Sequence, residues 1–180
     1  MSDLFPSIVR SLDDLVTNEG RFGTTYADPP WSYSNKAVRG AAVNHYSTLD
    51  LQSVCSEHFD QLISDNAHLH LWTTNAFLRD AFTVVEAWGF QFKSCVVWIK
   101  PQLGMGNYWR VSHEFLLLVV RGSLPFADKT CRSWLLHRRT RHSRKSFAVR
   151  ELIERVSPGP YLELYGREEQ PRTRWTVYGN

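Results

Sequence analysis

The sequence has little that would mark a secreted, zinc-binding or membrane protein. Its 180 residues contain three cysteines, Cys55, Cys95 and Cys131, which lie far apart and form no CxxC pair. This pattern indicates neither a disulfide framework nor a structural zinc site. No stretch approaches the ~18 consecutive apolar residues that a membrane span needs, and we assign no export signal to the N-terminus. We therefore expect a reduced, cytoplasmic protein.

The excess of positive charge is also small. A formal net charge of +3 and a pI near 8.8 fall short of an architectural DNA-binding protein but suit a polyanionic partner. Basic side chains gather in one stretch: Arg132, His137, Arg138, Arg139, Arg141, His142, Arg144 and Lys145. With 43% hydrophobic residues, the chain is long enough for one domain, residues 1–180, with a substantial core.

Hydrophobic patterns alternate between strand and helix periods along the chain. Apolar and β-branched runs predict strands over residues 21–27, 67–72, 92–99, 113–120, 161–165 and 175–178. Helical spacing predicts helices over residues 47–59, with Ser47 or Thr48 as N-cap, and over 76–88 and 148–156, besides a short helix or docking segment in residues 1–19. This order predicts an α/β domain with a largely parallel sheet, helices on both faces, and ligands at the carboxyl ends of the strands.

The first strong strand candidate stops at Asp28-Pro29-Pro30-Trp31. Proline fixes its own φ, lacks an N–H and restricts the residue before it, so this exit from the strand is stiff. It holds the Asp28 carboxylate, two carbonyls and the Trp31 ring in fixed directions, as a site for a flat, amino-bearing ligand requires. Taken alone, the four residues also fit a rigid strand exit capped by a tryptophan.

Several stretches together resemble the N6-adenine methyltransferase family, which includes the eukaryotic messenger-RNA adenosine methyltransferases and many bacterial and phage relatives. They cover residues 26–180 in the family's order, and the main ones are Asp28-Pro29-Pro30-Trp31, His70-Leu71-Trp72-Thr73-Thr74-Asn75, Val97-Trp98-Ile99-Lys100-Pro101, His113-Glu114 and Leu162-Glu163-Leu164-Tyr165-Gly166-Arg167. The resemblance implies a Rossmann-like methyltransferase domain and S-adenosylmethionine as methyl donor. The donor half follows the catalytic half, which is a permuted motif order.

The catalytic residues that this resemblance implies are Asp28, Pro29, Pro30 and Trp31. The lone pair of an adenine amino group is delocalised into the ring, so an enzyme must make it available for attack. We expect the Asp28 carboxylate and the Pro29 carbonyl to accept the amino hydrogens, and the Trp31 ring to stack on the base. The proton can leave after transfer, so we assign no separate general base.

The resemblance places donor binding on Asp28, Lys145, Glu163, Arg167 and Asn180. Lys145 is expected to meet the donor's carboxylate and Glu163 its ribose hydroxyls. His68 and His70 share one strand face, but no third ligand is apparent, so we interpret them as core or edge histidines and predict no metal.

Substrate binding is expected from the loops over residues 31–46 and 102–110 and from the basic stretch. The candidate residues are Trp31, Arg39, Tyr46, Tyr108, Trp109, Glu114, Arg138, Arg139 and Arg141. We expect methylation of adenine N6 in nucleic acid, DNA rather than RNA, in a bacterial or phage-infected cell, with the protein acting as a homodimer or with a partner subunit. The alternatives are methylation of cytosine N4 and a catalytically silent, nucleic-acid-binding subunit.

Overall fold

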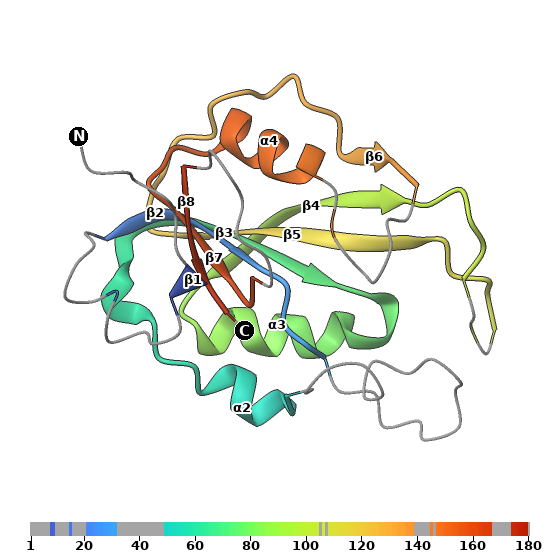
Figure 1. The fold of residues 1–180 in the computed structure, drawn as a ribbon, viewed down its shortest axis with the longest axis horizontal. Coiled ribbons are helices and arrows are strands. Elements are labelled where there is room, and N and C mark those ends of the chain that lie inside the picture. Colours follow the sequence, from blue (N-terminus) through green and yellow to red (C-terminus); the bar gives the residue numbers. More distant parts are fainter. Residues whose placement is uncertain are drawn as a thin grey trace.

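A single mixed sheet lies between two helical layers. The computed structural model describes residues 8–9, 15, 21–31, 49–104, 106, 108–138, 145, 147–166 and 174–179. Helix α4 (Phe147–Val156) covers one face of the sheet, and α2 (Leu51–Cys55) and α3 (Leu78–Ala87) cover the other (Figure 1). The predicted α/β architecture, with helices on both faces, is confirmed.

Eight strands form the sheet in the order β1-β8-β7-β2-β3-β5-β4-β6. Their bounds are β1 Ile8–Val9, β2 Phe22–Ala27, β3 Ile63–Thr73, β4 Gln91–Ile99, β5 His113–Arg121, β6 Trp134–Leu136, β7 Tyr161–Leu164 and β8 Trp175–Tyr178. Strand β5 pairs antiparallel with both β3 and β4, and the other described pairings are parallel. The carboxyl end of β2 therefore lies between those of β3 and β7.

The helical layers bury side chains that recur at helical spacing. Helix α3 buries Ala81, Val84 and Val85 against the sheet and is preceded by the short 3-10 helix Asn75–Phe77. It ends at Ala87, and the chain turns away at Gly89, whose φ of +72° is a left-handed conformation that glycine adopts without steric cost. On the other face, α4 buries Val149 and Ile153 in a cluster that includes three tryptophans, Trp72, Trp98 and Trp175.

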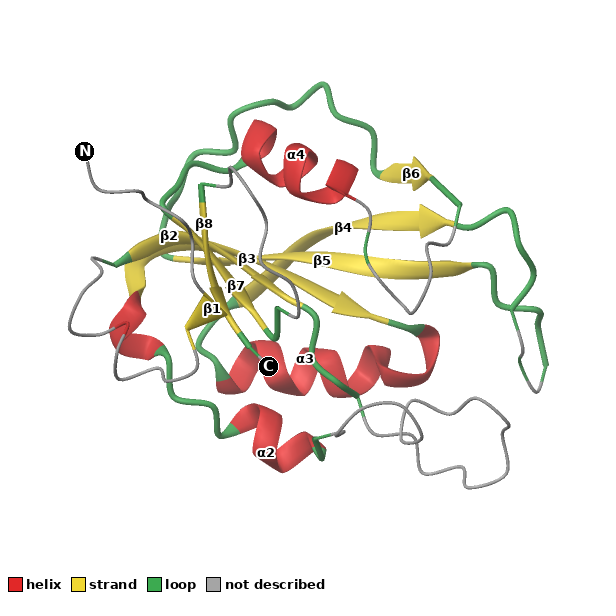
Figure 2. Cartoon of the chain, viewed as in Figure 1, coloured by secondary structure: helices red, strands yellow, loops and turns green. Residues whose placement is uncertain are grey.

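Four details of the sequence prediction need correction. Strand β6 lies in the basic stretch that begins at Arg132, for which no strand was predicted. Strand β5 runs against its neighbours, because it returns directly beside β4 as a hairpin partner (Figure 2). Ile8–Val9 form a strand rather than part of a helix. Helix α2 is capped by Asp50, whose side chain accepts from the Ser53 N–H at 2.8 Å.

Another short 3-10 helix, Asp60–Leu62, leads into β3. Among the residues that the structure describes, no helix has the length and apolar character needed to cross a membrane.

Candidate active site

The turn after β2 is held in place from both sides. The Trp31 N–H donates to the Pro29 carbonyl at 2.8 Å, and the Leu49 N–H donates to the Pro30 carbonyl at 3.0 Å. Asp28 is the first residue after the strand, and its side chain is 30% exposed. The Pro29 carbonyl, which has two lone pairs, thus already accepts one hydrogen bond. The stiff exit predicted from the two prolines is present and carries a partly exposed carboxylate.

Trp31 is buried beneath this turn. Its ring stacks on Phe77, with centroids 5.5 Å apart and an interplanar angle of 13°, and its Nε1 donates to the Trp72 carbonyl at 3.2 Å. One face of the ring is therefore covered, and Trp31 joins the end of β2 to that of β3. Stacking of Trp31 on a substrate base stays a prediction, and the contact with Phe77 and the burial of the ring restrict it.

Four side chains of alternating charge form a network next to the turn. The Lys145 Nζ lies 3.3 Å from Asp28 Oδ1 and 3.0 Å from Glu114 Oε2. The other oxygen of Glu114 accepts from Lys100. Lys100, Glu114 and Lys145 are mostly buried, with side chains 7%, 16% and 15% exposed. The network holds two positive and two negative groups, so its formal charges cancel.

Tryptophan rings line the network on the α4 side of the sheet. The Lys145 Nζ lies 5.0 Å from the centroid of the Trp72 ring, and the Lys100 Nζ lies 4.6 Å from that of Trp98. The two indoles are themselves 5.6 Å apart. Such cation–π contacts favour the charged form of a lysine that has been taken out of water.

The network keeps its members ionised. Burial alone would lower the pKa of Lys145, but the carboxylates of Asp28 and Glu114 together raise it above its ordinary value. Burial would likewise raise the pKa of Glu114, but Lys145 and Lys100 bring it below its ordinary value. At neutral pH, Lys145 is therefore a cation held between two carboxylates.

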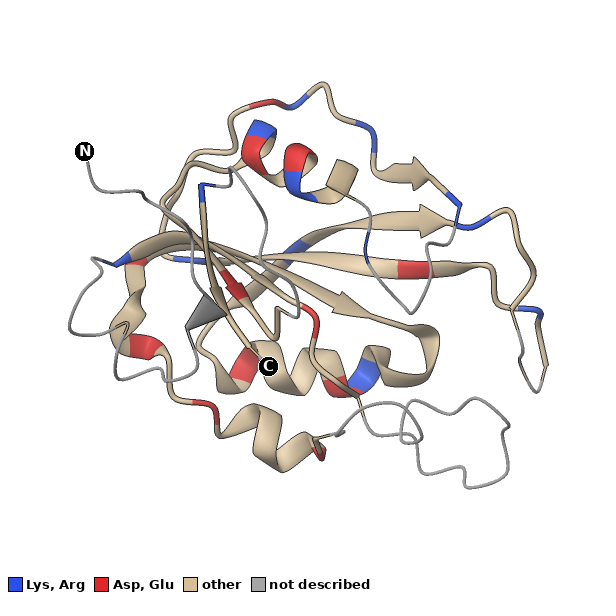
Figure 3. Cartoon of the chain, in the orientation of Figure 1, with Lys and Arg blue, Asp and Glu red and all other residues tan. Residues whose placement is uncertain are grey.

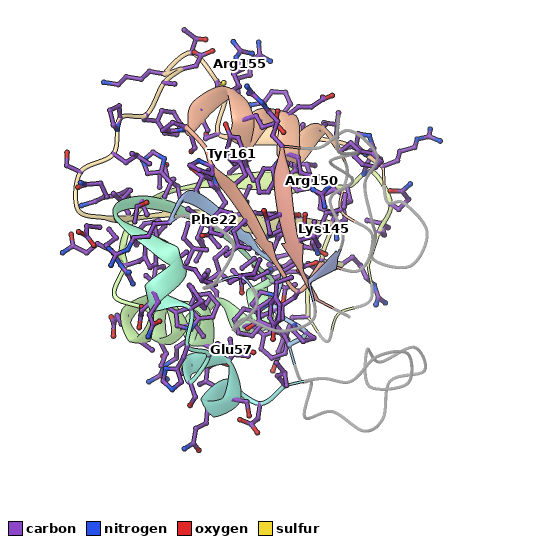
Figure 4. The ribbon with its side chains drawn as sticks, turned by 60° about the vertical axis from the view of Figure 1, so that its left-hand side comes forward. Phe22, Glu57, Lys145, Arg150, Arg155 and Tyr161 are labelled. Carbon is purple, nitrogen blue, oxygen red and sulfur yellow. The ribbon has the colours of Figure 1, made fainter. Side chains whose placement is uncertain are left out.

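A third carboxylate, outside the network, lies on the neighbouring strand β7. Glu163 of β7 is level with Tyr26 of β2, two residues before Asp28. Its Oε2 accepts from Arg150 of α4. Burial raises the pKa of Glu163 to about 7, although Arg150 acts in the opposite direction. Lys145 and Arg150 are labelled in Figure 4, where both lie beside the C-terminal strands.

The structure brings some of the predicted site residues together and leaves others apart. Asp28, Lys145 and Glu114 share one network, and Glu163 lies on the adjoining strand. Tyr108 and Trp109 are 95% and 85% exposed on the connection between β4 and β5. Arg138 is exposed just after β6. The remaining predicted residues lie outside the described part of the chain: Arg39, Tyr46, Arg139, Arg141, Arg167 and Asn180.

Sequence reasoning missed two of the charged partners. Lys100 follows the apolar run of β4 and reaches Glu114 because β4 and β5 pair antiparallel, with Ile99 opposite His113. Reading the two runs as a hairpin would have placed the lysine and the acid side by side. The partner of Arg150 is Glu163, which lies 13 positions later on another element. This pair could be predicted only by knowing that α4 packs over β7.

Comparison with known proteins points to the same family that the sequence motifs resemble. The MT-A70 family model matches residues 22–180. The chain is 26% identical over 189 residues to the Type II methyltransferase M.MunI of a Mycoplasma species, with 93% of the chain and 77% of that protein covered. It is 25% identical over 183 residues to the human N(6)-adenosine-methyltransferase catalytic subunit METTL3, with 96% of the chain covered.

The chain spans only 30% of the length of human METTL3 and 26% of an MT-A70-like putative N(6)-adenosine-methyltransferase from Medicago truncatula, to which it is 25% identical over 172 residues. The family match, in contrast, takes in the strand before Asp28, the charge network and Glu163. The chain therefore belongs to the MT-A70 family of S-adenosylmethionine-dependent adenine N6 methyltransferases.

Proposed function

We propose that this protein transfers a methyl group from S-adenosylmethionine to the N6 amino group of adenine in nucleic acid, and that the nucleic acid is DNA. The observation that carries the proposal is the partly exposed Asp28 carboxylate, held on a stiff turn by Lys145. The choice of DNA draws support from the match to a Type II methyltransferase over 77% of its length, against less than a third for human METTL3.

Asp28 supplies the acceptor that the reaction needs. Its second oxygen and the remaining lone pair of the Pro29 carbonyl accept the two amino hydrogens, which turns the nitrogen lone pair toward the methyl group. As the amino nitrogen becomes positive, the negative charge of Asp28 stabilises it. Lys145 balances that charge before the substrate arrives. Trp31 keeps the turn in place through Phe77 and Trp72.

The residues around Glu163 fit the methyl donor. When bound, the donor supplies a sulfonium-activated methyl group together with a ribose diol and a carboxylate. Arg150 Nη1 is a buried donor that has no hydrogen-bond partner among the described residues, and Glu163 accepts beside it. These two groups would hold oxygen-rich parts of the donor. Lys145, which lies beside Asp28, would meet the carboxylate of the donor.

Backbone packing next to Glu163 leaves no room for side chains. A Cβ atom added to Gly166 would lie 2.2 Å from Val177 Cγ1 and 3.4 Å from Glu163 Oε1, and one added to Gly179 would lie 1.9 Å from the Gly166 carbonyl oxygen. The ends of β7 and β8 thus pack closely against each other, and both positions require glycine. We assign the donor to this end of the sheet, with Arg167 and Asn180 as further contacts.

Nucleic-acid contact is assigned to the chain around β6. From Lys129 to Arg150 the sequence has eight lysine and arginine residues and no aspartate or glutamate. Figure 3 shows basic positions before and after β6, where Lys129, Arg132 and Arg138 are exposed. Such a surface binds phosphates in a salt-dependent manner. Tyr108 and Trp109 add exposed aromatic rings on the neighbouring loop, which suit stacking on an extruded base.

Two measurements test this function. Calorimetry with S-adenosylmethionine tests donor binding, and labelled donor mixed with duplex DNA, single-stranded DNA or RNA tests transfer. We expect donor binding and label in DNA, with N6-methyladenine as the product nucleoside. N4-methylcytosine would contradict the choice of base, and label in RNA alone would contradict the choice of polymer. Polymer binding without donor binding or transfer would identify a silent subunit.

Light scattering tests whether the protein associates as a homodimer.

A further inference from the structure

Lys100 is a buried cation that the proposed reaction does not itself use. It directly follows β4, where its N–H donates to the Ser112 carbonyl at 2.7 Å, so its backbone is fixed at the base of the β4–β5 connection. Its side chain is 7% exposed and contacts Glu114 and the face of Trp98. Removing a lysine from water costs free energy unless an anion accompanies it, so this position needs an explanation.

Glu114 divides its two oxygens between two lysines. Oε1 accepts from Lys100, and Oε2 lies 3.0 Å from Lys145 Nζ. The Lys145 ammonium is in turn shared between Glu114 and Asp28, which lies slightly farther away at 3.3 Å. The place of Lys145 between its two carboxylates therefore depends on how strongly Glu114 attracts it, and Lys100 reduces that attraction by neutralising the other side of Glu114.

We infer that Lys100 is a positioning residue for methyl transfer: by holding Glu114, it leaves Lys145 in contact with Asp28. Without Lys100, the buried Glu114 carboxylate has Lys145 as its nearest described cation. Lys145 then moves toward Glu114, or Glu114 takes up a proton. The first change takes the cation away from Asp28, and the second leaves Lys145 paired with Asp28 alone. Either one ends the sharing of Lys145 between the two carboxylates. The activity readouts of this inference rest on the proposed function, whereas the charge contacts can be measured without it.

The test compares Lys100→Met, Glu114→Gln, the double variant Lys100→Met/Glu114→Gln and Lys100→Arg with the wild type. Methionine has similar length and no charge, and arginine restores the charge. We expect Lys100→Met to lower kcat about 10-fold while KM for the donor and for DNA changes less than about 3-fold, as for a lost transition-state contact. Lys100→Arg should recover part of kcat.

Two readouts separate positioning from a merely structural role. First, Lys100→Met should raise the acid limb of the kcat profile by about one pH unit, because Glu114 loses one of its two cations. The charged groups described around Glu114 are Lys100 after β4, Lys145 before α4 and, through Lys145, Asp28 after β2. Second, the double variant, which lacks both members of the outer pair, should lose less activity than the product of the two single losses.

A carbon-13 NMR titration of the Glu114 carboxyl tests the contact independently of catalysis. We expect the pKa of Glu114 to rise in Lys100→Met and to fall back in Lys100→Arg. An inactive wild type with this pKa response would refute the proposed function and leave the contact intact. An active wild type whose kcat and acid limb do not change in folded Lys100→Met would overturn the inference, and so would strictly multiplicative losses in the double variant.

Discussion

Helix α4 joins two polar clusters that lie on one face of β3 and differ in charge. Directly after the helix, Ser157 Oγ lies 2.8 Å from His68 Nδ1 and 2.9 Å from His70 Nε2. His68 Nε2 lies 3.1 Å from the Leu124 carbonyl, which can only accept, so this nitrogen carries the hydrogen. Ser157 then donates to His68 and accepts from His70. The interpretation of these residues as satisfied core histidines is confirmed.

The second cluster begins directly before the helix, at Lys145, and is built from charges. His68 and Ser157 are each 1% exposed, whereas the Asp28 side chain is 30% exposed. The neutral cluster is buried, and the hydrogen bonds described for it join groups of the protein itself. The charged cluster reaches the surface at Asp28, whose carboxylate is partly exposed. The two clusters thus lie at different positions along β3. Substitutions in the neutral cluster should affect stability, and substitutions in the charged cluster should affect methyl transfer.

The largest effect is expected from Asp28→Ala in the charged cluster. Loss of the carboxylate removes the acceptor that stabilises the developing positive charge, so methyl transfer should fall by about 10²–10³-fold or more. Stability should change little, because Asp28 is partly exposed and Glu114 still accompanies the buried Lys145. Labelled-donor assays and thermal unfolding check both statements, with Asp65→Ala, whose side chain is 89% exposed, as the control. Retained transfer would refute the assigned role.

The neutral cluster should show the opposite pattern in Ser157→Ala. Removing the hydroxyl leaves buried nitrogens of His68 and His70 without their partner, which should cost about 2–4 kcal/mol in the free energy of unfolding. The kcat of the remaining folded protein should stay within a few-fold of the wild type. Denaturant unfolding measures the loss, and the exposed Ser133→Ala serves as control. A change in kcat without destabilisation would show that the two clusters are not separate.

A pH titration of stability sharpens the same comparison. Burial lowers the pKa of His70 to about 3, and it also lowers the pKa of His68. The unfolded chain, with its histidine pKa near 6.5, binds protons that the folded chain excludes, so stability is full above about pH 6.5 and falls below it. His70 alone should cost about 2 kcal/mol between pH 7 and pH 5.

His70→Gln is the matched variant for this titration. The glutamine amide can donate to Ser157 but does not titrate, so unfolding of this variant should depend less steeply on pH than that of the wild type. Chemical denaturation at a series of pH values measures both slopes. Equal pH dependence of stability in the two proteins would mean that the folded wild type protonates His70 as readily as the unfolded chain does.

The smallest effect is expected at the exposed basic surface. Arg138→Ala should weaken DNA binding only a few-fold and reduce the slope of log affinity against log salt by about one, as loss of one phosphate contact does. Fluorescence anisotropy at several salt concentrations gives the slope. Arg79→Ala, an exposed arginine of α3 on the other face of the sheet, should leave the slope unchanged. Equal effects of both variants would argue against a specific surface at β6.

The carboxyl ends of the strands were among the most predictable parts of this protein, whereas β3 begins at Ile63, four residues before its predicted start. Trp175–Tyr178 was placed without error and the start of β2 within one residue, because an apolar run bounded by turn residues has few alternative structures. The family motifs placed Asp28 and Lys145 in one expected donor site, which spacing could not do, since 117 positions separate the two residues. Their direct ion pair was not predicted.

What could not be predicted depends on pairing between distant segments. The strand β6 is three residues long, and it forms because its backbone pairs with β4, Val97 lying opposite Trp134. Local composition carries no sign of that partner. The ion pair of Arg150 with Glu163 and the hydrogen bonds of the Ser157 hydroxyl with His68 and His70 also join separate segments, and local composition does not reveal them. Each of these contacts becomes visible only once the order of strands is known.

One measurement tests the central claim most directly: nucleoside analysis of DNA after incubation with labelled S-adenosylmethionine and either the wild type or Asp28→Ala. The account predicts labelled N6-methyladenine with the wild type and none above background with the variant, at equal folded concentration. Labelled N6-methyladenine at similar rates with both proteins would contradict it, because the reaction would then not depend on the carboxylate at the end of β2.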